Sequence, residues 1–157
     1  MPEKETLQRA RADKRAGKSP STQAGEFVRE EIHHVREGKH GARSTKQTIA
    51  IGLSKARRAG VRLPAPRGAK ASTRRRAAAA IRASRKRSRP SATRSRGVRR
   101  ALKRQGHRAA SRQALSRQAK MAARRRSAVS RSAAARKAAR TRQRHGTMRR
   151  RRATASY

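Results

Sequence analysis

STQAGEFVREEIHHVREGKHGARSTKQTIAIGLSKARRAGVRL, residues 21–63, holds nine of the fifteen Leu, Ile, Val and Phe residues in this chain of 157. Apolar residues recur every three to four positions in two blocks, which is typical of helices with one buried face. Gly38 and Gly60 follow the blocks, where glycine commonly ends a helix. The pattern predicts helices over 22–37 and from residue 44 or 45 to Gly60, joined by a short loop into an antiparallel hairpin.

The apolar stripes of these two helices define the predicted hairpin core. Its members are Ala24, Phe27, Val28, Ile32, Val35, Ile49, Leu53 and Ala56. A hairpin of this size with one narrow stripe is close to the lower limit for autonomous folding. Homodimerisation, or docking of a segment from the rest of the chain, would bury the stripe more completely.

The chain divides by composition into four segments. We predict a flexible leader at 1–20, the hairpin module at 21–63, a Pro/Gly/Arg linker at 64–76 and an Ala/Arg/Ser-rich tail of low complexity at 77–157. Leu, Ile, Val and Phe make up only 15 of 157 residues, and so low a share combined with high net charge indicates disorder. The expected fold class is therefore all-α, with a small antiparallel helical hairpin followed by a largely disordered tail. We expect that tail to become helical when phosphates neutralise it.

Charge is unevenly distributed along the chain. All seven carboxylates lie in the first 37 residues together with eight Lys or Arg, and the other 40 of 48 basic residues follow. The formal net charge is +41. No folded core can neutralise this excess, so the sequence predicts an external polyanion. Nucleic acid has the matching charge density, about one charge per 1.7 Å of duplex.

Arginine supplies 37 of the 48 basic residues, and its planar guanidinium binds phosphate through two parallel hydrogen bonds. The densest basic runs are the predicted nucleic-acid contacts. They are Arg74, Arg75, Arg76, Arg85, Lys86, Arg87, Arg99, Arg100, Arg124, Arg125, Arg126, Arg149, Arg150, Arg151 and Arg152.

These features predict a non-enzymatic, histone-like DNA-binding protein of the cytoplasmic nucleoid, with little sequence preference. Two alternatives remain open: an RNA-binding or ribosome-associated protein, and a protein-interaction module with a localising basic tail. The longest apolar run, at 77–81, is far shorter than the ~20 residues that cross a bilayer, so no membrane insertion is expected.

We expect no catalytic residues, cofactor, metal or small-molecule substrate. The strongest metal-ligand candidates are His33, His34 and His40 with Glu30 and Glu37. Because neighbouring residues on a helix point about 100° apart, the adjacent histidines favour a surface interpretation.

Three stretches carry a family resemblance: AGEFVREE at 24–31, HVREGKHGARS at 34–44 and KQTIAIGLSKARRAG at 46–60. Together they resemble a bacterial family of small basic proteins catalogued as a domain of unknown function, over about residues 22–64. The resemblance implies a bacterial source and a compact helical module, and it implies no activity. The composition of 77–157 is separately similar to the basic tails of bacterial linker-histone-like proteins.

Overall fold

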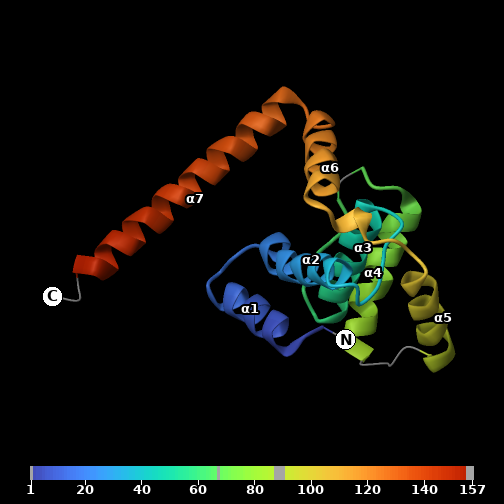
Figure 1. Cartoon of the computed structure of the whole chain (residues 1–157). Helices are drawn as coiled ribbons and strands as arrows, with labels where there is room; N and C mark the ends of the chain where they lie inside the picture. The colour runs from blue at the N-terminus through green and yellow to red at the C-terminus, as the bar shows by residue number, and fades with distance from the viewer. Residues whose placement is uncertain (1, 67, 87–90, 155–157) are drawn as a thin grey trace. The chain divides into compact units, whose positions relative to one another are not determined.

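The computed structural model describes residues 2–66, 68–86 and 91–154, with 85–86 and 144–154 described by their backbone alone. The described residues form seven α-helices and one short 3-10 helix (Figure 1). In chain order these are α1 (Lys4–Arg15), α2 (Pro20–Arg36), α3 (Thr45–Arg58), α4 (Ala71–Lys86), α5 (Ala92–Lys103), η1 (Arg108–Ala110), α6 (Arg112–Arg124) and α7 (Ala128–Thr154). The chain divides into two compact units, residues 1–115 and residues 116–157.

Local sequence determines where α2 and α3 begin and end. The hydroxyl oxygens of Ser19 and Ser44 accept hydrogen bonds from backbone N–H groups three residues on, at 3.4 and 3.2 Å. Pro20 occupies the first turn of α2, where its missing N–H costs no hydrogen bond. Gly38 and Gly60 follow the two helices with φ of +75° and +94°, a backbone conformation that glycine adopts without strain.

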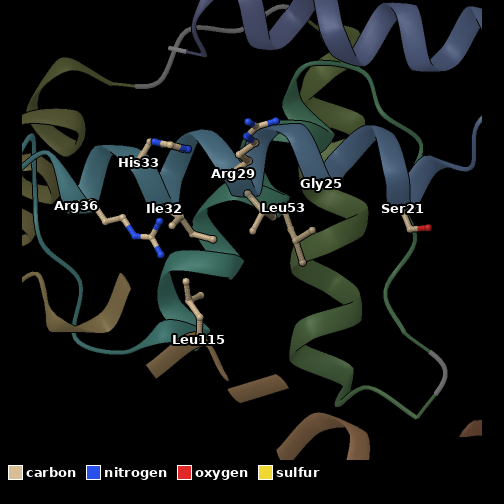
Figure 2. A pocket seen from close by; sticks show the side chains of 9 residues that line it. Ser21, Gly25, Arg29, Ile32, His33, Arg36, Leu53 and Leu115 are labelled. Atoms are coloured by element: carbon tan, nitrogen blue, oxygen red, sulfur yellow. The ribbon is translucent and has the colours of Figure 1, made fainter. Parts of the chain in front are cut away.

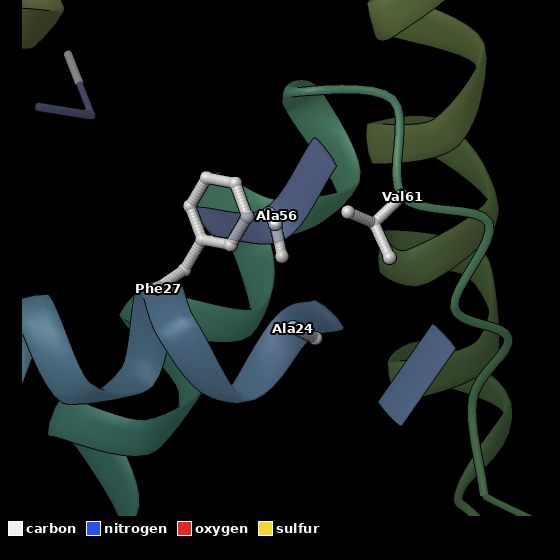
Figure 3. Packing of buried hydrophobic residues seen from close by; sticks show 5 residues of the cluster. Ala24, Phe27, Ala56 and Val61 are labelled. Carbon is white, nitrogen blue, oxygen red and sulfur yellow. The ribbon is translucent and has the colours of Figure 1, made fainter. Parts of the chain in front are cut away.

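The first unit is organised around the contact between α2 and α3, with α1 packed on α2 and α4 packed on α3. One hydrophobic cluster joins α1, α2, α3 and the chain that follows α3 (Figure 3). Its buried members are Ala10, Ala24, Phe27, Ala56 and Val61. Most of these side chains are small, so this core depends on close approach of backbones rather than on large apolar volume.

A second cluster attaches the η1 segment to the hairpin. Val35 on α2 and Ala110 of η1 are both 0% exposed and belong to the same cluster. Two polar contacts add to it: Arg36 Nε donates to the Ala110 carbonyl at 2.8 Å, and Thr45 Oγ1 donates to the Ala109 carbonyl at 2.7 Å. A distant segment of the same chain therefore covers part of the apolar stripe of α2.

The prediction of a small helical hairpin followed by a largely disordered tail is wrong, because the C-terminal part of the chain is structured and helical. The range 77–157 contains most of α4 and all of α5, α6 and α7, and Ala77 of α4 is only 4% exposed. The physical reason is that Ala and Arg are strong helix formers, and small alanines pack closely where large side chains would not fit. Serines also cap the helices: Ser111 and Ser127 accept backbone hydrogen bonds at the starts of α6 and α7, both at 3.2 Å. The four-segment division itself stays a prediction.

The second unit contains most of α6 and all of α7. Every residue from Ala119 to Gln143 is exposed. On α6, Lys120 lies three positions after Arg117, and Arg124 lies four positions after Lys120. This spacing places the three basic residues on one face of the helix. Within the ranges that the structure describes, no helix is both long and apolar enough to span a membrane.

Candidate functional site

Every side-chain carboxylate is engaged in an ion pair inside the first unit, at distances of 2.5 to 3.4 Å. The pairs are Arg9 with Glu5 and Glu26, Lys18 with Asp13, Lys39 with Glu3 and Glu37, Lys55 with Glu30 and Glu31, His34 with Glu3, and His40 with Glu31. All the basic partners lie at or before Lys55. Among the described residues, no Lys or Arg after this position forms an ion pair with a carboxylate.

The most buried of these pairs form a charged cluster between α2, α3 and the loop at 37–44. The side chains of Glu30 and Glu31 are each 1% exposed, and Lys55 Nζ lies 3.4 Å from Glu30 Oε1 and 2.5 Å from Glu31 Oε2. His40 Nε2 lies 2.9 Å from Glu31 Oε1. Despite these short distances, neither Glu31 oxygen takes part in a well-formed hydrogen bond. Burial of a carboxylate under these conditions is costly unless nearby cations compensate for it.

A second group of charges lies at the start of α1. Glu3 Oε1 accepts hydrogen bonds from His34 Nε2 at 2.8 Å and from Lys39 Nζ at 3.2 Å. The bond from His34, and then that from Lys39, lowers the pKa of Glu3 below its ordinary value. Hydrogen bonds to Glu37 and to Glu3 raise the pKa of Lys39. These contacts attach the start of α1 to α2 and to Lys39.

The predicted phosphate contacts are distributed over several helices. Those with described side chains are all exposed: Arg74, Arg75 and Arg76 on α4, Arg99 and Arg100 on α5, and Arg124, Arg125 and Arg126 at the end of α6 and just beyond it. Arg85 and Lys86 belong to α4, and Arg149, Arg150, Arg151 and Arg152 to α7, by their backbone. Arg87 lies outside the described residues.

The helix register extends the predicted contacts Arg99 and Arg100 by Arg96 and Lys103, which the adjacent basic runs did not include. On α5, Arg96, Arg99, Arg100 and Lys103 are all exposed and occupy positions i, i+3, i+4 and i+7. This spacing places them on one face of the helix. Leu102, about 110° around the helix from the centre of this face, is partly buried. The signal was present in the sequence as a helical period of basic residues, and we call these four residues the α5 stripe.

The predicted core residues divide into two groups. Ala24, Phe27, Val35 and Ala56 are buried, whereas Val28, Ile32, Ile49 and Leu53 are only partly buried. Three of the second group line an open groove of about 440 Å³ over α2, α3 and the start of α6 (Figure 2). Its lining residues are Ser21, Gly25, Val28, Arg29, Ile32, His33, Arg36, Leu53 and Leu115. The floor is apolar and the rim is basic, and these lining residues include no carboxylate that would serve as a general acid or base.

Comparison with known proteins places the charged cluster in a recognised domain. Residues 11–67 match DUF6496, a family of unknown function. This confirms the resemblance to a domain of unknown function. No curated protein and no solved structure matches the chain. The DUF6496 segment includes Glu31, His40 and Lys55 and ends before α4, so the α5 stripe lies outside it.

Proposed function

We propose that this protein is a non-enzymatic DNA-binding protein of the nucleoid, which neutralises backbone phosphates with little preference for base sequence. The pairing of all seven carboxylates with cations at or before Lys55 carries the proposal. Because the chain's acids are already engaged, the exposed basic side chains of α4 to α7 require their counter-ions from another molecule. A nucleic-acid backbone supplies such charges at high density.

The α5 stripe is the most regular candidate contact surface. From Arg96 to Lys103 the helix advances by about 10 Å. A duplex presents about six phosphates over the same axial length. Three of the four residues are arginines, whose guanidinium groups are suited to phosphate oxygens. One such length of duplex therefore carries enough phosphates to neutralise all four cations without any base contact.

The burial of the aromatic side chain favours duplex DNA over single-stranded RNA. Sequence-specific recognition of single-stranded RNA commonly stacks bases on exposed aromatic rings. The only phenylalanine, Phe27, is 1% exposed inside the core, and the only tyrosine, Tyr157, lies outside the described residues. RNA or ribosome binding, a protein partner and homodimerisation stay predictions, and the following experiment also compares RNA with DNA.

Fluorescence anisotropy with random-sequence duplex DNA tests the proposal on the full chain. A variant with Arg96→Gln, Arg99→Gln and Arg100→Gln should bind more weakly. Its plot of log affinity against log salt should be shallower by about 0.9 for each phosphate that the variant no longer neutralises. The matched control replaces Arg9, Lys18 and Lys39 by Gln. It removes the same formal charge from cations that already have carboxylate partners. We therefore expect a smaller loss of affinity and a smaller change in the salt dependence.

Two results would contradict the proposal. One is the absence of duplex binding by nuclease-treated protein in dilute buffer. The other is an affinity that does not change between low and moderate salt, because phosphate neutralisation must be salt-dependent. Tighter binding to structured RNA than to duplex DNA at the same salt would favour the RNA alternative.

A further inference from the structure

Three potential metal-ligating side chains converge at the inner end of the charged cluster. Glu31, His34 and His40 each present a ligand atom, and these atoms lie within 4.8 Å of one another. Glu31 and His34 are three residues apart on α2 and share one face, while the loop after α2 brings His40 back against them. In a chain with a net charge of +41, this is an unusual concentration of electron-pair donors.

The hydrogen bonds of His40 leave one of its ring nitrogens facing a carboxylate. His40 Nδ1 lies 3.0 Å from the Gly41 carbonyl oxygen, which can only accept, so Nδ1 is the donor. In a neutral imidazole the other nitrogen, Nε2, then carries a lone pair. The Nε2 atom lies 2.9 Å from Glu31 Oε1, which is also an acceptor. Two electron-pair donors side by side in this way are suited to sharing a metal ion.

His34 shows the complementary arrangement. Its Nε2 lies 2.8 Å from Glu3 Oε1, so the carboxylate holds a proton on this nitrogen. In a neutral ring the Nδ1 lone pair remains available to a ligand. A carboxylate that fixes the tautomer of a coordinating histidine is the usual outer contact of protein zinc sites.

From these observations we propose that Glu31, His34 and His40 bind a divalent zinc ion. Imidazole nitrogen and carboxylate oxygen suit Zn²⁺, with bonds of about 2.0–2.2 Å. Ligand atoms of such a tetrahedral site are about 3.3 Å apart, so separations of up to 4.8 Å must close by at most about 1.5 Å on binding.

The neighbouring groups are compatible with the ion. Lys55 Nζ lies on the Oε2 side of Glu31 and His40 lies on the Oε1 side, so the metal does not have to displace the lysine. The buried carboxylate of Glu30 also pairs with this lysine. Access is available because the side chains of His34 and His40 are 12% and 17% exposed. A cavity of about 240 Å³ between α1 and α2 is lined in part by Glu3 and His34.

The proposed ion would stabilise a junction of the first unit. It joins α2 to the loop at 37–44, and Glu3 extends the connection to the start of α1. The same loop holds the end of α5 and the segment after it, because Gly41 N donates to the Leu102 carbonyl at 3.0 Å and Ala42 N donates to the Gly106 carbonyl at 3.1 Å. Zinc binding would therefore limit movement of the loop at 37–44, which forms backbone hydrogen bonds with the end of α5 and the residues after it.

Titration calorimetry with ZnCl₂ on full-length protein tests this site, after removal of nucleic acid and treatment with EDTA. We expect one Zn²⁺ per chain in the wild type and in His33→Gln, a matched control because His33 is the exposed neighbour of His34. His34→Gln and His40→Gln should each weaken binding at least tenfold. Glu3→Gln, which alters only the outer contact, should weaken it by about tenfold or more.

A spectroscopic measurement on the wild type tests the proposal even if the variants do not fold. Co²⁺ bound to the same ligands should give the intense visible d–d absorption of a four-coordinate ion, and Zn²⁺ should abolish that absorption. The proposal is overturned if the wild type binds no Zn²⁺, if Co²⁺ stays in an octahedral aqueous-type environment, or if folded His34→Gln and His40→Gln bind Zn²⁺ as tightly as His33→Gln. In those cases His40 and Glu31 contact one another without a metal ion.

Discussion

At position 52, α2 and α3 approach so closely that only glycine fits. A Cβ atom there would lie 2.7 Å from Val28 Cα and 2.9 Å from the Phe27 carbonyl oxygen. Both are backbone atoms of α2, so the helices themselves would have to separate. We expect Gly52→Ala to lower the free energy of unfolding by about 1–3 kcal/mol, the range for overpacking of a core. Urea denaturation followed by circular dichroism at 222 nm measures the change.

Gly25 on α2 provides the control for this substitution. It lies within a helix, and a Cβ atom added there meets no other atom within 4 Å. Gly25→Ala should therefore raise the free energy of unfolding by about 0.5–1 kcal/mol, because alanine loses less backbone entropy than glycine in a helix. Equal destabilisation by both substitutions would contradict the close approach at Gly52.

At the scale of elements, the sequence predicted α2 and α3 but not what covers them. The 3.6-residue period predicts these two helices, and the glycines at 38 and 60 predict where they end. Burial of η1 against α2 depends on Ala109 and Ala110, which carry no periodic apolar signal and contribute mainly carbonyl oxygens and small volume. A composition argument that counts only large apolar residues cannot detect such an element.

The same limit applies to the charged cluster. The sequence indicated the histidines of α2 and of the following loop as metal-ligand candidates, together with Glu30 and Glu37. The structure instead places Glu31 beside His34 and His40, because a spacing of three keeps Glu31 on the face of His34. The position of His40 depends on the loop at 37–44, whose path is held by contacts with residues more than sixty positions away. No local pattern encodes those contacts.

Gly41 is the point where this loop and the segment after α5 meet. A Cβ atom at this position would lie 1.8 Å from the Gln105 carbonyl oxygen, an impossible distance. Gly41→Ala should therefore break the backbone hydrogen bonds to Leu102 and Gly106 and detach the segment. Hydrogen exchange of peptides covering 102–111 should become at least tenfold faster, while α1 keeps its protection. Gly106→Ala is the control, because it meets nothing within 4 Å and should leave exchange unchanged.

At the scale of the whole molecule, the distribution of charge divides the chain into a balanced part and an unbalanced part. Residues 1–37 contain all the acids and a nearly equal number of Lys and Arg, and these acids are engaged in ion pairs. The following 120 residues contain 40 basic residues and no acid. Helices in this part form against repulsion between like charges, so their stability must depend on the surrounding ions.

The α5 stripe shows the size of this repulsion. Its four residues form four like-charge pairs at spacings of three or four, and each such pair destabilises a helix by about 0.2–0.5 kcal/mol. Raising NaCl from 0.01 to 1 M shortens the screening length from about 30 to about 3 Å, which is less than the separation within a pair. We therefore expect the helix signal in circular dichroism and the Tm to rise with salt. The Arg96→Gln, Arg99→Gln, Arg100→Gln variant should show a smaller rise. A Tm that falls with salt would mean that the ion pairs of the first 55 residues, rather than repulsion among the later cations, dominate the electrostatic contribution to stability.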